Sequence, residues 1–213
     1  IVSRFDIAFS TSQATFDNVK CLQGSRVWQF GGSTTNVVAR GVYTEGTAAI
    51  LVMNGKTGSS LTIIDSTVSG SPMIGSYIDN DGFEYFDKFS YNLQVLEEDE
   101  VTPIAGATIT MYDNAGQIFQ VTTDSNGKIA EQYITRVYGT VDTPALPSVY
   151  SYTNKYPYKL VIEKAGYETY TENFTQLLSE PIVKTVALKT AKPIRISTEG
   201  PVLALAPETG SSS

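Results

Sequence analysis

The sequence contains no histidine and a single cysteine, Cys21, among its 213 residues. These absences remove the commonest general base and metal ligand, and with them any Cys-His or Ser-His nucleophile pair. One cysteine forms no internal disulfide, and its neighbours Val19 and Leu22 predict a buried, inert thiol. The sequence therefore predicts a structural or binding protein that is not an enzyme.

Positive charge is also scarce: 15 Lys and Arg stand against 22 Asp and Glu, which gives a net charge of -7. Because no basic stripe neutralises phosphates, nucleic acid is not an expected partner. No apolar run approaches the roughly 20 residues that span a bilayer, so membrane insertion is not expected either. The N-terminus lacks a signal-peptide pattern, and we expect either a removed targeting segment or a longer parent chain.

Helical periodicity is nearly absent as well. Short apolar or alternating runs recur between clusters of Gly, Ser, Asn and Thr, which is typical of strands and turns. The sequence therefore predicts an all-β fold. We expect a solenoid-like segment at 1–70, an aromatic connector at 71–90, a β-sandwich at 91–190 and a C-terminal tail at 191–213.

The segment 1–70 has a weak internal repeat: the run at 16–19 is echoed at 39–42 and again at 64–68. Repeats of about 20 to 25 residues with short strands indicate a solenoid of stacked coils. The segment resembles the final coils of a right-handed parallel β-helix, as in phage tailspikes, adhesins and polysaccharide-cleaving enzymes. An antiparallel sandwich with coincidental spacing is the alternative.

The open end of such a solenoid presents unpaired backbone groups, which natural examples cover. The chain begins at Ile1 and Val2 with a strand-like run and no room for a cap. We therefore expect earlier coils to be missing from this chain, or a neighbouring subunit to cover the end.

The connector 71–90 and the residue after it are rich in aromatic side chains: Tyr77, Phe83, Tyr85, Phe86, Phe89 and Tyr91. Exposure of such a cluster would favour aggregation. We expect it to be buried, closing the last coil and docking the next domain.

The segment 91–190 alternates as short strands, expected at 91–96, 108–112, 118–122, 158–162 and 182–188. Three ordered motifs lie among them: PIAGA at 103–107, TDSNGKI at 123–129 and YKLVIEKAGY at 158–167. In this order they resemble the carboxypeptidase regulatory-like (transthyretin-like) family of Ig-like β-sandwiches. The resemblance implies an accessory module that is usually non-catalytic and common in secreted, cell-surface and virion proteins.

The presence of glycine at three positions in these motifs has a local explanation. Gly106 and Gly127 permit tight turns before strands, and Gly166 ends a strand where the chain reverses.

A long insert at 139–155 departs from the family pattern. Loops of this length in compact domains are often functional. We therefore expect Tyr150, Tyr152 and Asn154 to form a contact loop for a host surface receptor or a glycan.

The tail 191–213 carries two apolar runs beyond the last expected strand. Three interpretations are open: it completes the sheet locally, it is disordered, or it adds as a strand to a neighbouring subunit. In the third case the assembly strand consists of Ile194, Ile196, Val202, Leu203 and Leu205.

A partial calcium-loop pattern is the only indication of a cofactor. Oxygen ligands at alternate positions and a glycine turn suit a hard cation, and Asp79, Asp81 and Asp87 would supply them. The full spacing and the terminal bidentate Glu are missing, so an ordinary acidic turn is the alternative.

Two other functions remain open. Paired carboxylates among Asp17, Asp65, Asp79 and Asp81 would make the chain a fragment of a polysaccharide-degrading enzyme, or its accessory carbohydrate-binding module. The run 207–210, PETG, after Leu205-Ala206 resembles a sortase sorting signal with an inserted alanine, which would make the protein a wall-anchored adhesin.

The preferred interpretation is a non-enzymatic structural or adhesive protein that is extracellular, at a cell surface or on a virion. We expect a fibre, spike, decoration or filament subunit. It would associate with itself as a trimer or polymer, or with other subunits of a larger assembly, and present loops to a host or a glycan.

Overall fold

The computed structural model of the chain describes residues 7–9, 13–18, 20–22, 26–30, 36–45, 49–53, 58–68, 73–74, 82–141 and 150–192. Every helix or strand assigned in these residues is a β-strand, which confirms the predicted all-β class. In the same ranges no helix is long and apolar enough to cross a membrane. The strands are β1 (Ile7–Phe9), β2 (Gln13–Asp17), β3 (Lys20–Leu22), β4 (Arg26–Phe30), β5 (Asn36–Arg40), β6 (Tyr43–Glu45), β7 (Ala49–Met53), β8 (Ser60–Ile64), β9 (Met73–Ile74), β10 (Glu84–Glu97), β11 (Thr108–Asp113), β12 (Gly116–Thr122), β13 (Gln132–Val141), β14 (Tyr150–Asn154), β15 (Tyr158–Glu163), β16 (Tyr170–Phe174) and β17 (Ile182–Leu188).

The strands β1 to β9, called here the parallel half, pair only in parallel with one another. In one sheet Gln13 of β2 lies opposite Asn36 of β5, which lies opposite Ser60 of β8. A second sheet has the order β1-β4-β7-β9, and β3 pairs with β6. Paired residues in these sheets are 21 to 24 positions apart, the same spacing as the sequence repeat.

After each of the strands β2, β5 and β8 the chain turns a corner at one residue whose backbone has the left-handed conformation. Asn18, Gly41 and Asp65 have φ angles of 57°, 59° and 50°. Each donates its backbone N–H across to the neighbouring strand, to the carbonyl oxygens of Arg40, Ile64 and Lys88 in turn. Glycine adopts this backbone region freely, and Asn and Asp tolerate it better than other residues. The corner therefore recurs in register along the sheet because each repeat supplies a residue that fits it.

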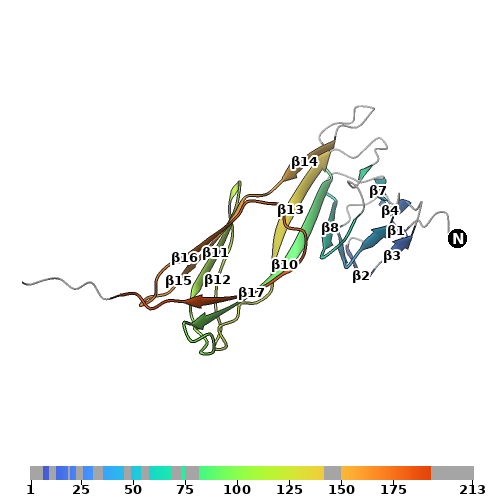
Figure 1. Ribbon diagram of the computed structural model, residues 1–213. Coiled ribbons are helices and arrows are strands. Elements are labelled where there is room, and N and C mark those ends of the chain that lie inside the picture. Colours follow the sequence, from blue (N-terminus) through green and yellow to red (C-terminus); the bar gives the residue numbers. More distant parts are fainter. Residues whose placement is uncertain are drawn as a thin grey trace, which may run out of the picture.

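The 14-residue strand β10 joins the parallel half to the rest of the molecule. Its residues 84–88 pair in parallel with β8, and its residues 91–97 pair in parallel with β17. Strand β13 runs antiparallel along 84–91 of β10. One sheet therefore continues through both parts, in the order β14-β13-β10-β8-β5-β2, with β17 beside β10 (Figure 1).

The segment predicted as an aromatic connector includes the first part of β10. Phe83, Tyr85, Phe89 and Tyr91 are at most 2% exposed, as expected, whereas Phe86 is half-buried and Tyr77 lies outside the described residues. The two parts therefore meet within a strand and not at a linker.

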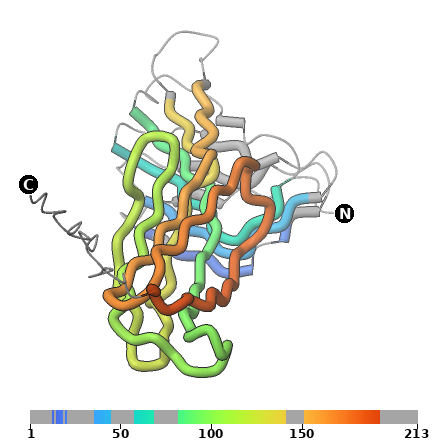
Figure 2. Tube along the Cα trace, turned by 60° about the vertical axis from the view of Figure 1, so that its left-hand side comes forward, coloured from blue at the N-terminus to red at the C-terminus, as the bar shows by residue number. Residues whose placement is uncertain are grey.

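The strands β10 to β17, called here the two-sheet half, bury their own core. A second, antiparallel sheet has the order β12-β11-β15-β16. Side chains of both sheets form the core cluster, among them Leu93 and Val95 from β10 and Ile109, Leu160 and Ile162 from the second sheet. Figure 1 shows this half and the parallel half following one another, and Figure 2 shows the strands of the two-sheet half from another side.

The strands predicted in the two-sheet half agree well with the structure. The expected runs at 91–96, 108–112, 118–122 and 158–162 lie within β10, β11, β12 and β15, and β17 spans 182–188 as expected. The expected turn glycines Gly106, Gly127 and Gly166 have φ angles of 66°, 70° and 88°. Strands β13, β14 and β16 were not expected.

Candidate functional site

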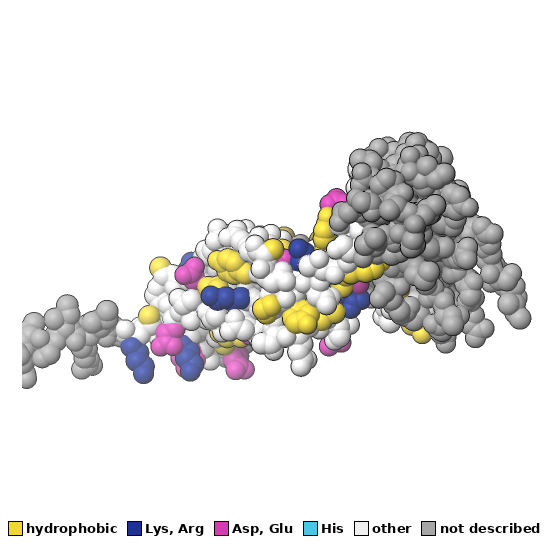
Figure 3. All heavy atoms as spheres, turned by 90° about the horizontal axis from the view of Figure 1, so that it is seen from above, with side chains coloured by type: hydrophobic (Ala, Val, Ile, Leu, Met, Phe, Trp, Pro, Cys, Tyr) yellow, Lys and Arg dark blue, Asp and Glu magenta, His cyan; other side chains and the backbone are white. Residues whose placement is uncertain are grey.

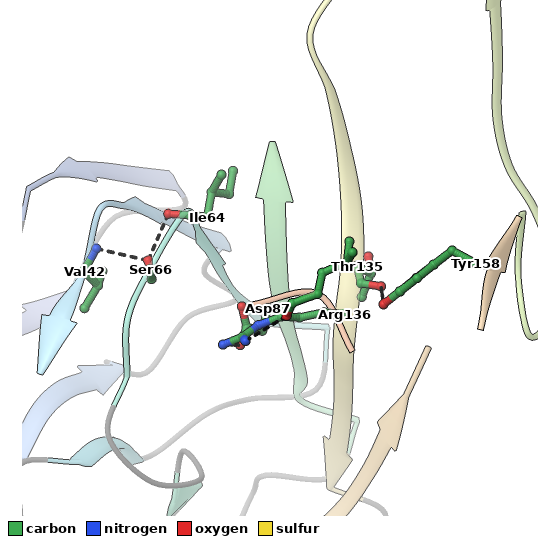
Figure 4. A network of polar contacts seen from close by, with 8 residues as sticks. Val42, Ile64, Ser66, Asp87, Thr135, Arg136 and Tyr158 are labelled. Atoms are coloured by element: carbon green, nitrogen blue, oxygen red, sulfur yellow. Dashed lines mark hydrogen bonds and ion pairs between the residues drawn. The ribbon is translucent and has the colours of Figure 1, made fainter. Parts of the chain in front are cut away.

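A β-bulge interrupts the pairing of β10 with β13 where the two halves meet. Asp87 lies opposite Val137, whereas Lys88 lies opposite Thr135, so Arg136 is the extra residue. A bulge bends its strand and redirects a side chain. Here it directs Arg136 toward Asp87, and Figure 4 shows the two side chains pointing at one another.

Asp87 and Arg136 form a buried ion pair. Arg136 Nη2 lies 2.7 Å from Asp87 Oδ2, and the two side chains are 17% and 6% exposed for Arg136 and Asp87 respectively. The guanidinium also lies 4.6 Å from the centre of the Phe89 ring and donates from Nη1 to the carbonyl oxygen of Leu178 at 3.3 Å. Arg136 thereby links β10, β13 and the segment that leads into β17.

Burial dominates the electrostatics of this junction. It raises the pKa of Asp87, although the hydrogen bond and positive charge of Arg136 oppose the shift. Burial, with the charge of Asp87 nearby, also raises the pKa of Tyr85 well above its ordinary value, so this phenol stays protonated. Among the described residues, four buried polar atoms here and nearby have no hydrogen-bond partner: Tyr85 OH, Asp87 Oδ1, Tyr91 OH and Arg136 Nε.

Other polar contacts around the junction hold backbone in place. Ser66 Oγ, on the parallel half, accepts from Val42 N at 3.0 Å and donates to the Ile64 carbonyl at 2.9 Å. On the two-sheet half the Tyr158 hydroxyl donates to the Thr135 carbonyl at 3.1 Å (Figure 4). These contacts and the ion pair hold strands in position.

The carboxylates considered for polysaccharide cleavage are not brought together in the described residues. Asp17 is exposed on β2, whereas Asp65 Oδ1 accepts from Ser90 N at 2.6 Å and so ties the third corner to β10. Asp79 and Asp81 lie outside the described residues. Of the four candidates, the structure therefore describes only Asp17 and Asp65, and Asp65 is engaged with the backbone of Ser90.

Three hollows of 350, 390 and 430 Å³ lie on the described surface of the two-sheet half. Each is lined by a single carboxylate, Glu180, Asp113 or Glu163. Asp113 Oδ1 accepts from the backbone N–H groups of Ala115 and Gly116, so it caps the turn between β11 and β12. None of these three hollows holds two carboxylates for acid–base catalysis.

Of the three candidate calcium ligands, the structure describes only Asp87. Asp87 lies inside β10 and is ion-paired with Arg136, not in a loop, while Asp79 and Asp81 lie outside the described residues. No group of three His, Cys, Asp or Glu side chains in the described ranges could hold a metal ion.

The residues expected to form a contact loop lie in a strand. Tyr150, Tyr152 and Asn154 belong to β14, which pairs antiparallel with β13 at the edge of the sheet. The Tyr152 ring packs edge-on to Tyr85, with centres 6.5 Å apart, and lies against Gly139, where any side chain would contact it. The expectation of a continuous loop over 139–155 was wrong at both ends, because the Thr and Val residues of 139–141 and the Tyr and Thr residues of 150–154 favour strands.

For the remaining predicted residues, the structure describes either nothing or the backbone alone. The assembly strand of Ile194, Ile196, Val202, Leu203 and Leu205 is outside the described residues, which end at Lys192. Cys21 lies in β3, whose backbone pairs with β6. Sequence reasoning missed Arg136, and only its place opposite β10 distinguishes it from other strand residues.

No protein-family model matches the chain, and no curated protein matches it. Two solved structures show a partial likeness: a 3-chlorocatechol 1,2-dioxygenase from Rhodococcus opacus 1CP and the Bacillus anthracis TIE protein. Each is 18% identical with a TM-score of 0.29, over 43% and 50% of this chain. The matches span 45% and 19% of those two proteins' lengths. A TM-score of this size indicates neither a shared fold nor a shared activity.

Proposed function

We propose that this chain is a non-enzymatic structural or adhesive subunit of a fibre, spike, decoration or filament. It works outside the cell, on a virion or at a cell surface, associates with copies of itself, and presents loops to a host surface or a glycan. The absence of histidine from the sequence and the structural use of Asp65, Asp87 and Asp113 support a role without catalysis.

In this proposal the parallel half is the end of a parallel β-helix. Its support is the parallel pairing of strands 21 to 24 residues apart and the repeated left-handed corner at Asn18, Gly41 and Asp65. Stacked repeats of this kind contact only their neighbours, so they build long, rigid bodies.

The two-sheet half is then a transthyretin-like sandwich. Its support is the order of the three motifs, together with two sheets that share one core and with positive φ angles at Gly106, Gly127 and Gly166. A module of this kind projects from the end of the β-helix as a rigid continuation, because β10 belongs to both.

The observation that carries the proposal is the edge that β1, β2 and β3 form at one end of the described parallel half. β1, β2 and β3 each end their sheet, and among the described residues no strand pairs with their outer edges. Asn18 N donates to Arg40 O, so by alternation along β2 the N–H of Thr15 points away from β5. Such edges pair readily with another strand, and proteins rarely leave them open. As expected from the sequence, earlier coils or a neighbouring subunit would cover this end, and in this proposal the neighbour is a further copy of the chain.

Sedimentation velocity over a wide range of concentrations tests the proposal. Native protein is expected to form species larger than the monomer, and Thr15→Pro is expected to form smaller ones, because proline removes an outward N–H without breaking the bonds to β5. Thr15→Val keeps that N–H and is the matched control. A native protein that stays monomeric at every concentration would contradict self-association, and assembly unchanged in Thr15→Pro would contradict the role of this edge.

A further inference from the structure

Strand β12 is a second sheet edge with unusual properties. It ends the sheet β12-β11-β15-β16, and its seven residues, GQIFQVT, include no charged residue and no proline. Natural proteins usually protect edge strands with charges, prolines, bulges or very short lengths. Of these devices β12 has only a bulge, at its pairing with Met111 and Tyr112 near one end.

The outward backbone groups of β12 can be assigned from the hydrogen-bond pattern. Thr123 N donates to Ala107 O, toward β11. Because successive residues of a strand point their N–H groups to opposite sides, Val121 also faces β11, whereas Thr122 and Gln120 face outward. Among the described residues β12 pairs with β11 alone, so these outward groups meet no other strand.

The other edge strands, including β2 at the end of the parallel half, fit a twofold contact between identical edges less well than β12. β2 carries Asp17, β16 carries Glu172, and β17 carries Lys184, which bonds Glu172 at 2.8 Å. β14 is uncharged but shorter, and the carbonyl oxygen of Asn154 at its end accepts from Asn114. β12 is therefore the longest uncharged edge in the described part of the chain.

Net charge makes an uncharged edge the favourable place for two copies to meet. Each copy carries a net charge of -7, so charged surfaces of two copies repel one another. On the face seen in Figure 3, the charged side chains of the described residues lie among uncharged atoms. An edge without Asp or Glu brings two acidic chains together with the least repulsion.

We propose that β12 binds β12 of a second copy, antiparallel and across a twofold axis. The two four-stranded sheets then form one eight-stranded sheet. A twofold contact needs a self-complementary surface, and the exposed Gln117, Gln120 and Thr122 provide side chains that both donate and accept hydrogen bonds. Ile118 and Val121, only partly buried against the core of their own half, gain cover from the second copy. The inference rests on the proposed self-association and adds a second surface to the edge at β2.

Hydrogen exchange of the native protein at low and high concentration measures whether individual backbone amides of β12 become protected when two copies bind. The amides of Gln120 and Thr122 are expected to exchange at least roughly tenfold more slowly at high concentration, because they become bonded to the second copy. The Thr122→Glu variant places a carboxylate of each copy near the same edge and is expected to abolish this protection, raising the dimer dissociation constant about tenfold or more. Thr171→Glu makes the same change on the opposite edge strand, β16, and is expected to leave the protection intact.

The outcomes separate the two proposals. If the native protein is monomeric at every concentration, both fail. If it self-associates while Gln120 and Thr122 exchange at a constant rate, or if Thr122→Glu retains the protection, the β12 inference fails and the proposed function stands. Gln120→Pro gives a second variant, because it removes an outward N–H and spares the bonds of Phe119 and Val121 to β11. A well-folded Gln120→Pro protein that dimerises like the native one would also overturn the inference.

Discussion

Arg136 Nη2 lies 2.7 Å from Asp87 Oδ2 at the point where β10 leaves the parallel half and enters the two-sheet half. The β-bulge that turns Arg136 inward is the structural cause of this pair. Through the ion pair and its bond to the Leu178 carbonyl, Arg136 links β10, β13 and the segment before β17 at the place where β10 passes from one half to the other.

Removal of one partner of this pair is expected to be costly. Arg136→Ala leaves the Asp87 carboxylate buried without its counter-charge and should lower the free energy of unfolding by about 3 to 5 kcal/mol. Lys184→Ala is the control, because Lys184 bonds Glu172 at 2.8 Å with side chains 25% and 28% exposed, and its loss should cost no more than about 1 kcal/mol. Urea denaturation measures both, and equal losses would contradict the structural role of the junction.

The raised pKa of Asp87 predicts the sign of a pH effect. The folded chain holds this proton more tightly than the unfolded chain, so the carboxyl favours folding below its unfolded pKa of about 3.9, and that contribution is lost as pH rises through the raised value. Relative to Asp87→Asn, the native free energy of unfolding should therefore fall as pH rises from about 4 toward neutrality. The reverse slope would show that Arg136 outweighs burial.

Two exposed carboxyl groups change the free energy of unfolding with pH in the opposite direction. Their effects cancel when the native protein is compared with Asp87→Asn. Hydrogen bonds from the side chain of Thr102 lower the pKa of Asp99, and a backbone hydrogen bond from Lys128 lowers the pKa of Asp124. Both are present in the native protein and in Asp87→Asn. The difference between the two denaturation series thus reports Asp87 alone.

The free energy of unfolding should depend on the side chain of Asp65, which forms the corner after β8. Asp65→Ala removes the acceptor for the buried Ser90 N–H and places alanine at a φ of 50°, so we expect a loss of about 2 to 4 kcal/mol. Asp65→Asn keeps an acceptor oxygen and tolerates this backbone, and should cost under about 1 kcal/mol. Thermal unfolding of the two variants distinguishes them, and similar midpoints would show that the corner does not depend on this side chain.

Two glycines with similar backbone angles should respond differently to a methyl group. A side chain on Gly127 would overlap the carbonyl oxygen of Val95, whereas nothing lies within 4 Å of the corresponding position at Gly166. Gly166→Ala should therefore cost only the backbone strain, about 1 to 2 kcal/mol. Gly127→Ala should cost clearly more, measured by urea denaturation, since the strand β10 must move. If Gly166→Ala costs as much, the packing around Gly127 is looser than described.

Local patterns in the sequence determined the all-β class, several strands and the positions of turns. β17 was expected with its observed bounds because Ile182 to Leu188 alternates regularly, and alternation depends only on neighbours along the chain. The turns at Gly106, Gly127 and Gly166 were equally local, because each depends on the backbone freedom of one residue.

Pairing between distant strands was decided only by the tertiary structure. The sequence placed a connector where β10 runs unbroken between β8 and β17, and a loop where β14 pairs with β13. Nothing local marks Arg136 as a bulge, since a bulge exists only relative to the partner strand that it opposes. The joint at Asp87 and the open edges of β2 and β12 follow from strand order, which depends on contacts between residues far apart in the chain.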